Sequence, residues 1–316
     1  MAANPIFILA PGRCFSSLIC AMIGQHPQFY GLLETQLLAR DTLQAWWESF
    51  GNGVHSHGLS RAVAEIVYGG QSAYEVQAAR EWLWLRRERS TADLLAELAA
   101  LVHPLVVIEK TPMVTYSAEH MERTRENFPD ARFLHLVRHP IGYGCSLLEF
   151  YHRFSQVRSA SETEALLCNP ESIFFGLMSK PGDVHALDPQ RCWYLRQSAV
   201  VAFLRGVPPR QQMRMRAEDL LVCPSASLGA IARWAGVRDD PFAIEEMTHP
   251  ERSPFASIGP WNARLGGDPK FLKNPVLQSA KTRIPSLEDP IPWSSRGSRV
   301  GLRPEVKSLA SEFGYH

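Results

Sequence analysis

Residues 5–24, PIFILAPGRCFSSLICAMIG, contain the pattern that decides the fold. A short apolar run ends at Gly12, and a second begins after a cation and two hydroxyls, Arg13, Ser16 and Ser17. A strand that turns through glycine into a helix directs free backbone N–H groups and the positive end of the helix dipole at one place. We therefore expect an anion-binding loop, although serines at the start of a helix can also act simply as caps.

The composition argues against a protein that binds nucleic acids or membrane surfaces and against one that spans a membrane. The chain has 316 residues, of which 45% are hydrophobic and 21% charged, as in ordinary globular proteins. Its net charge is +1, whereas proteins that bind nucleic acids or membrane surfaces usually carry a clear basic excess. Its apolar runs fall short of the roughly 20 residues of a membrane span. The near-equal numbers of basic and acidic residues still allow a local basic pocket.

The six cysteines are scattered along the chain, without CxxC pairs or the spacing of a metal site. We expect reduced thiols in a cytoplasmic protein that holds no metal. The first apolar stretch is short and lacks a preceding positive segment, so we expect a core strand there and not a signal peptide.

Four short apolar stretches have the length and sharp boundaries of buried parallel strands: Ile6–Leu9, Leu105–Ile108, Phe133–Val137 and Met213–Arg216. A further strand is expected just before Glu34. Apolar periodicity predicts helices over Thr35–Phe50, Ala73–Arg87, Thr91–Leu101, Pro112–Asn127, Ile141–Phe154, Arg191–Leu204, Ser225–Trp234 and Pro304–Phe313. Strands that alternate with helices indicate an α/β fold with a parallel sheet.

Residues 248–296 are rich in proline and glycine and show little periodicity. A long irregular stretch inside a compact domain is usually a functional loop. We therefore expect a single domain over residues 1–316, with a helical insertion at 35–104 and a lid or substrate segment at 248–296.

The stretch FPDARFLHLVRHPIGYGCSLLEFY, residues 128–151, repeats the order of strand, cation and helix. Arg138 follows the strand, Pro140 stands where a helix would begin, and Ser146 lies on that helix. Ligands of open α/β sheets bind at the carboxyl ends of strands, so Arg138 and Ser146 can share a phosphate. The alternative is an ion pair between Arg138 and a carboxylate such as Glu149. Two anion sites on one sheet predict a ligand with two separated phosphate-like groups.

A nucleoside triphosphate matches the first loop poorly. Its motif needs a lysine after the second glycine together with acidic Mg²⁺ ligands, whereas Phe15 and Ser16 occupy the corresponding positions. The strand before Lys110 ends in Glu109-Lys110 and lacks an acidic Walker-B pattern. An anion held without a metal fits better, and an ATP-dependent small-molecule kinase is kept as an alternative.

Together these motifs resemble sulfotransferases that use 3′-phosphoadenosine 5′-phosphosulfate (PAPS). The resemblance is greatest to the sulfotransferase domains of bacterial polyketide synthase pathways that form olefins. In that family, a loop after the first strand holds the 5′-phosphosulfate, and an arginine and a serine eight residues apart hold the 3′-phosphate. The resemblance therefore assigns PAPS binding to Gly12, Arg13, Cys14, Phe15, Ser16, Ser17, Arg138 and Ser146. It implies a P-loop-like three-layer sandwich with a central parallel sheet flanked by helices.

Two further segments support the resemblance, and three features depart from it. EKTP at 109–112 and RAEDLL at 216–221 are similar to family segments. However, Phe15 stands where a small glycine is usual, so we expect a different loop shape or a different packing against adenosine. Ala217 replaces a tyrosine, and its contact must come from elsewhere. The late Arg-Lys-Gly segment has only loose substitutes in Arg296 and Arg299.

Sulfuryl transfer to an alcohol needs a base, cations for the developing negative charge and a stabilised leaving phosphate. Lys110, at the end of its strand, is expected to point into the crevice and act on this charge, unless it merely pairs with Glu109. The resemblance assigns the base to Glu34, expected at the start of a helix. The rival is His249, at the beginning of the lid, as a base or as a substrate ligand.

The resemblance implies an acceptor hydroxyl on a small molecule or on a β-hydroxyacyl chain bound to an acyl carrier protein. Tryptophans of the insertion, Trp46, Trp47, Trp82 and Trp84, are either core residues or walls of an apolar acceptor pocket closed by Trp261. A nucleotide-binding protein without catalytic activity is a further alternative.

Overall fold

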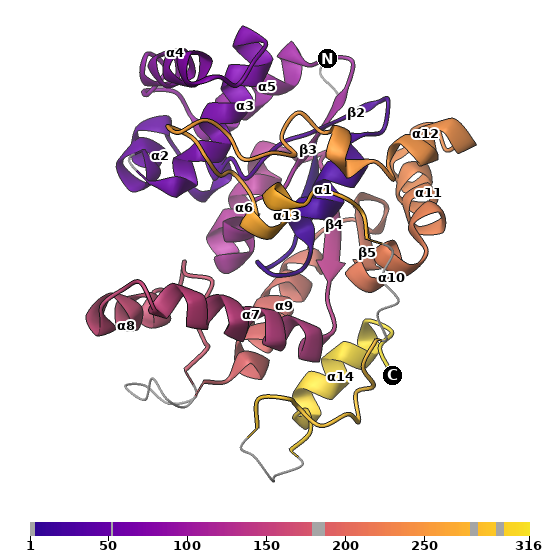
Figure 1. The fold of residues 1–316 in the computed structure, drawn as a ribbon. Coiled ribbons are helices and arrows are strands. Elements are labelled where there is room, and N and C mark those ends of the chain that lie inside the picture. Colours follow the sequence, from indigo (N-terminus) through magenta and orange to yellow (C-terminus); the bar gives the residue numbers. More distant parts are fainter. Residues whose placement is uncertain (1–3, 52, 179–186, 279–283, 295–299) are drawn as a thin grey trace.

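The computed structural model of the chain describes residues 4–51, 53–178, 187–278, 284–294 and 300–316. Its centre is a five-stranded sheet in the order β2-β3-β1-β4-β5, with every neighbouring pair parallel (Figure 1). The strands are β1 (Ile6–Leu9), β2 (Phe29–Gly31), β3 (Val106–Glu109), β4 (Arg132–Val137) and β5 (Gln212–Arg216). The predicted α/β class with a parallel sheet is confirmed. Arg296 and Arg299 lie outside the described residues.

The strands place hydrophobic side chains on both faces of the sheet, which makes the fold three-layered. Successive residues of a strand point to opposite faces. Accordingly, Ile6 and Ile8 of β1 belong to one core cluster, whereas Phe7 and Leu9 belong to another. All four are at most 2% exposed.

Helices cover both faces and form the remaining structure. The α-helices are α1 (Ser16–Gly24), α2 (Leu43–Phe50), α3 (His57–Tyr68), α4 (Ala73–Trp84), α5 (Thr91–Leu101), α6 (Ala118–Asn127), α7 (Pro140–Ser155), α8 (Ala160–Cys168), α9 (Pro189–Leu204), α10 (Ala217–Val222), α11 (Pro224–Ala235), α12 (Pro241–Glu246), α13 (Pro269–Lys273) and α14 (Pro304–Glu312). Short 3₁₀ helices are η1 (Leu37–Ala39), η2 (Val54–Ser56), η3 (Pro112–Tyr116), η4 (Pro209–Gln211) and η5 (Pro250–Arg252). Among the described residues, none of these helices is both long and apolar enough to span a membrane.

The predicted helix over Thr35–Phe50 is wrong in its first half. There the chain forms only η1, and α2 begins at Leu43, where the side chain of Thr42 caps the helix by accepting from Ala45 N–H. Glu34 consequently lies in an irregular segment between β2 and η1 and does not open a helix. The backbone is tied down in this region because Gln36 N–H donates to Thr111 Oγ1 at 3.2 Å.

Helix α3 is missing from the helices that the sequence predicts. The helix begins at His57 despite the glycine at position 58, and Leu59, Ala62 and Val63 on it are fully buried. Leu59 and Val63 belong to the same core cluster as Phe7 and Leu9. Tertiary burial therefore outweighs the low helix propensity of glycine.

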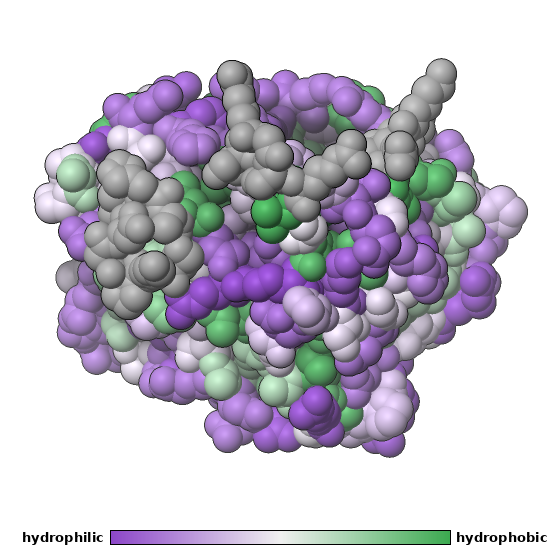
Figure 2. All heavy atoms as spheres, turned by 90° about the horizontal axis from the view of Figure 1, so that it is seen from below, coloured by the Kyte–Doolittle hydropathy of each residue, from purple (hydrophilic) through white to green (hydrophobic). Residues whose placement is uncertain are grey.

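The helices of residues 35–104 gather at one end of the molecule, whereas the chain after α12 returns across α1 and carries α13 in front of it (Figure 1). On the face that Figure 2 shows, hydrophobic residues form small patches among hydrophilic ones in the coloured part. Isolated apolar residues are ordinary on protein surfaces and do not by themselves mark a docking site.

Candidate active site

The first loop connects β1 to α1 at the carboxyl edge of the sheet. Arg13 and Phe15 have φ of 74° and 58°, in the left-handed region that non-glycine residues occupy at a cost of about 1 kcal/mol or more. Phe15 occupies the N-cap position of α1 and supplies no side-chain cap. Ser16 and Ser17 begin the helix itself, so the alternative that they act only as caps is not supported. The loop directs first-turn N–H groups outward, as an anion site requires.

Arg13 joins the two predicted anion sites. Its Nε donates to Ser146 Oγ at 3.1 Å, on α7. Arg138 approaches the same residue from β4, since its Nη1 donates to the Arg13 carbonyl at 2.7 Å. The Arg138 guanidinium also lies 4.1 Å from the centre of the Phe15 ring. The two motifs are therefore joined by direct contacts of their arginines, and Glu149 pairs with Lys270 and Arg153 instead of Arg138.

Phe15 and Cys14 serve as packing elements of this loop. The stacked Arg138 side chain is largely buried, and burial lowers its pKa from the ordinary value. Burial raises the pKa of the Cys14 thiol to about 12, so Cys14 stays protonated at neutral pH. Gly12 is closely packed, because a Cβ there would lie 2.3 Å from Ile173 Cδ1 and would push that side chain aside. Its N–H donates to the Tyr116 hydroxyl at 3.3 Å.

Lys110 leaves the carboxyl end of β3 and points at the first loop. Its side chain is 2% exposed, its Nζ donates to Ser17 Oγ at 3.0 Å, and it also forms an ion pair with Glu34. The alternative pairing with Glu109 is not found, since the Glu109 carboxylate instead accepts from Thr35 and Thr111. A cation that follows β3, a hydroxyl on α1 and a carboxylate that follows β2 thus meet at one point.

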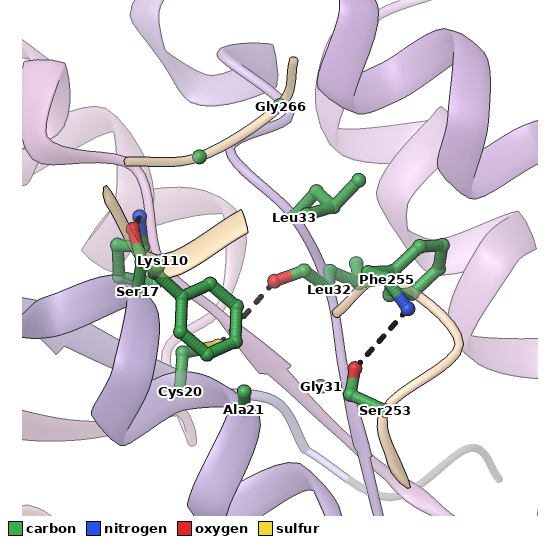
Figure 3. A pocket seen from close by; sticks show the side chains of 12 residues that line it. Ser17, Cys20, Ala21, Gly31, Leu32, Leu33, Lys110, Ser253, Phe255 and Gly266 are labelled. Atoms are coloured by element: carbon green, nitrogen blue, oxygen red, sulfur yellow. Dashed lines mark hydrogen bonds between the residues drawn. The ribbon is translucent and has the colours of Figure 1, made fainter. Parts of the chain in front are cut away.

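A small cavity lies beside this cluster. Figure 3 shows Lys110 and Ser17 together on one side and the apolar side chains of Leu33 and Phe255 on another. The cavity volume is about 20 Å³, close to the space that one water molecule needs. An acceptor can enter only if part of the wall moves.

Part of that wall belongs to the strap, which we define as residues 264–270. Glu34 N–H donates to Gly266 O at 2.9 Å, and Asp268 N–H donates to Ser17 Oγ at 3.0 Å. The Asp268 carboxylate pairs with Arg13, Nη1 to Oδ2, at 2.9 Å. Gly266 has φ of 132°, and a Cβ there would lie 3.0 Å from Gly58 Cα. The strap therefore packs directly on the cluster and neutralises part of the basic loop.

His249 is not brought to this cluster by its described contacts. Its Nδ1 lies 2.9 Å from Glu251 Oε1, and its Nε2 lies 3.5 Å from Glu245 Oε1. Trp46 is fully buried in the core, and Trp261 is 82% exposed. Trp46 is thus a core residue, the first of the two alternatives, and none of the five tryptophans lines the cavity described above. The residues that line the cavity are Ser17, Cys20, Ala21, Gly31, Leu32, Leu33, Lys110, Ser253, Phe255, Gly266, Gly267 and Phe271.

A family model matches most of the chain, including the first loop and the cluster of Lys110, Ser17 and Glu34. Residues 5–241 match the model of the family described as the sulfotransferase family. The chain belongs to that family. None of the curated proteins compared with this sulfotransferase matches its sequence.

Solved structures show the same fold. The sulfotransferase domain from the curacin biosynthetic pathway superposes with a TM-score of 0.75 at 20% identity, over 99% of this chain and 98% of that one. The sulfotransferase domain of the Synechococcus PCC 7002 olefin synthase superposes with a TM-score of 0.70 at 22% identity, over 99% of this chain and 96% of that one. At these identities the likeness establishes the fold and not the substrate. The predicted resemblance is confirmed at this level.

Sequence reasoning missed two residues of the site. Asp268 follows two glycines and precedes Pro269, which indicates a helix cap but gives no sign of its contact with Arg13. Tyr116 lies on η3, where its hydroxyl meets the Gly12 N–H. Ala217 stands where the family has a tyrosine, and next to it the Tyr315 hydroxyl donates to Glu218 Oε2 at 2.7 Å.

Proposed function

We propose that this sulfotransferase moves the sulfuryl group of PAPS to a hydroxyl. The observation that carries the proposal is the meeting of Lys110, Ser17 and Glu34 beside the first loop. PAPS is a substrate here, and Gly12, Arg13, Cys14, Phe15, Ser16, Ser17, Arg138 and Ser146 would form its binding surface. Two phosphate-bearing ends suit a surface in which Arg13 connects Ser146 to the start of α1.

The acceptor oxygen attacks sulfur, the bond between sulfur and the 5′-phosphate oxygen breaks, and adenosine 3′,5′-bisphosphate leaves. Glu34 takes the hydroxyl proton, and Lys110 stabilises the negative charge that grows on the sulfuryl and leaving oxygens. No step requires a metal, and the described residues hold no group of three or more His, Cys, Asp or Glu side chains arranged as a metal site.

For the acceptor, we propose a small molecule or a β-hydroxyacyl chain on an acyl carrier protein. Apolar walls at Leu32, Leu33, Phe255 and Phe271 suit an alkyl chain next to the reacting hydroxyl. The two structural neighbours come from a curacin pathway and an olefin synthase. We further propose that the lid comprises residues 248–296, that the insertion at 35–104 supports the acceptor side, and that the protein works in the cytoplasm.

Thermal shift tests the donor. Adenosine 3′,5′-bisphosphate at about 100 times its dissociation constant should stabilise the fold by roughly 2.7 kcal/mol. ADP, and ATP with Mg²⁺, should stabilise it far less. Arg138→Ala should abolish the bisphosphate shift, whereas Arg233→Ala, which removes an exposed arginine on α11, should leave it unchanged. A shift with ATP and Mg²⁺ alone would identify a kinase instead.

An assay of PAPS turnover distinguishes an enzyme from a nucleotide-binding protein without catalytic activity. PAPS is incubated with the protein and a 3-hydroxyacyl N-acetylcysteamine thioester, and release of adenosine 3′,5′-bisphosphate is measured. Release without the thioester reports transfer to water. Binding of the bisphosphate without any consumption of PAPS would mean that the protein binds the nucleotide but does not catalyse transfer.

A further inference from the structure

Glu109 is a buried carboxylate that the proposed mechanism leaves unused. It is the last residue of β3, directly before Lys110, and it is 3% exposed. Its Oε1 accepts from Thr35 Oγ1 at 2.9 Å and from Thr111 Oγ1 at 2.5 Å. A buried carboxylate is unfavourable unless it is well hydrogen-bonded, so its presence calls for a physical reason.

The two threonine hydroxyls extend this bonding into the backbone. Thr35 Oγ1 accepts from Leu37 N–H at 3.3 Å, and Thr111 Oγ1 accepts from Gln36 N–H at 3.2 Å. The carboxylate of Glu109 therefore ties the chain that follows β2 to the chain that follows β3. These are the two strand ends that deliver Glu34 and Lys110.

Other hydrogen bonds of the segment around Glu34 and Thr35 attach it to α2 and to the strap, and not to the segment of Lys110. Trp46 Nε1 donates to Thr35 O at 3.0 Å, which anchors the segment to α2. Glu34 N–H donates to Gly266 O, which belongs to the strap. Two side-chain links thus join the segment of Glu34 to the segment of Lys110. One is the direct ion pair between Glu34 and Lys110, and the other is the hydrogen-bond network of Glu109, Thr35 and Thr111. Burial also raises the pKa of Glu109, although Lys110 opposes this effect.

We propose that Glu109 is a positioning residue of the active site. It sets the separation and orientation of Glu34 and Lys110 through hydrogen bonds to Thr35 and Thr111. The inference rests on the proposed function, since it assumes that Glu34 and Lys110 act in the transfer. Side chains that orient the ligands of metal sites change activity by about 10- to 100-fold when they are removed, and we expect an effect of similar size here.

Three variants test the network. Glu109→Met keeps the length of the side chain but removes both acceptors, and it should lower kcat about 10- to 100-fold with KM for PAPS nearly unchanged. Glu109→Gln keeps an oxygen for the two hydroxyls and should restore most of the activity. Thr35→Val is a nearly isosteric change and should reproduce the loss in part. PAPS consumption, with the thioester and with water as acceptor, is the readout.

Coupling is the decisive measurement. In the Glu109→Met background, Thr35→Val should cause much less loss of kcat than it does alone, because its hydrogen bond to Glu109 is already absent and only the bond from Leu37 N–H remains to be removed. Thermal unfolding and the bisphosphate-induced shift report whether each variant is folded. If Glu109→Met does not fold, Thr35→Val and Thr111→Val still test the network, and wild-type kcat in both would overturn the inference.

The outcomes distinguish the inference from the proposed function. If Glu34→Gln and Lys110→Met are inactive but Glu109→Met has wild-type kcat, the inference alone is wrong. If Glu109→Gln is as impaired as Glu109→Met, the charge and not the hydrogen bonding is needed, and positioning is overturned. If the wild-type protein consumes no PAPS, the proposed function fails and the inference fails with it.

Discussion

Asp268 Oδ2 lies 2.9 Å from Arg13 Nη1, and this contact joins residues 255 positions apart in the sequence. The Asp268 carboxylate thus already pairs with the Arg13 guanidinium, which is the cation that the first loop would offer to the donor. Asp268 also donates its N–H to Ser17 Oγ. Under the proposed function, the donor would have to displace Asp268 from Arg13 in order to bind there.

Asp268→Asn should tighten binding of adenosine 3′,5′-bisphosphate. The change removes the competing charge while it keeps the backbone N–H, and a partly exposed ion pair is worth about 1 kcal/mol, or about fivefold in the dissociation constant. Isothermal titration calorimetry measures the effect. Glu119→Gln, the same change of charge on exposed α6, is the control. Unchanged or weaker binding would show that Asp268 does not compete.

Lys110→Met should lower the rate of PAPS consumption by about 100- to 1000-fold, the usual loss when one group that stabilises developing charge is removed. The donor shift in thermal unfolding should survive, because the first loop and Arg138 remain. Single-turnover release of the bisphosphate measures the chemical step. A variant with normal chemistry but lost binding would assign Lys110 to the donor site instead.

Glu34→Gln and His249→Gln should separate the two candidate bases. Glu34 contacts Lys110, whereas the described contacts of His249 are with Glu245 and Glu251. We expect Glu34→Gln to lower kcat by about 100- to 10,000-fold, the range for loss of a general base, and His249→Gln to have little effect. The reverse result would move the base to the lid.

The stability of the fold should decline with acid, and His135 should account for part of the loss. Burial lowers the pKa of His135 to about 3, whereas an unfolded chain titrates near 6.5. Between these values the unfolded state binds more protons, so stability is full above about pH 6.5 and falls as pH falls. At pH 5 the loss from His135 is about 2 kcal/mol.

His135→Gln should flatten this dependence between pH 7 and pH 5, which thermal unfolding at several pH values measures. His139, whose pKa burial lowers to about 4, has the same sign and should account for part of the remaining slope. An unchanged slope in the His135 variant would show that this histidine is not the group that titrates.

Local patterns in the sequence were sufficient for much of this protein. The apolar runs of β1 and β4, the glycine turn before α1 and the proline that opens α7 gave the strands, the loop and the spacing of Arg138 and Ser146. They did so because a strand or helix boundary depends on residues close in the chain. Helix α3 was missed because its stability comes from the burial of Leu59 and Val63.

The sequence by itself determined the α/β class, the sulfotransferase family and most of the basic residues of the loop. Only the tertiary structure decided that Lys110 meets Glu34, 76 positions earlier, that Asp268 pairs with Arg13, and that Glu109 joins two strand ends. The physical reason is that these contacts depend on the strand order, β2-β3-β1, and on the return of the chain across α1. Neither is encoded in the periodicity of any single segment.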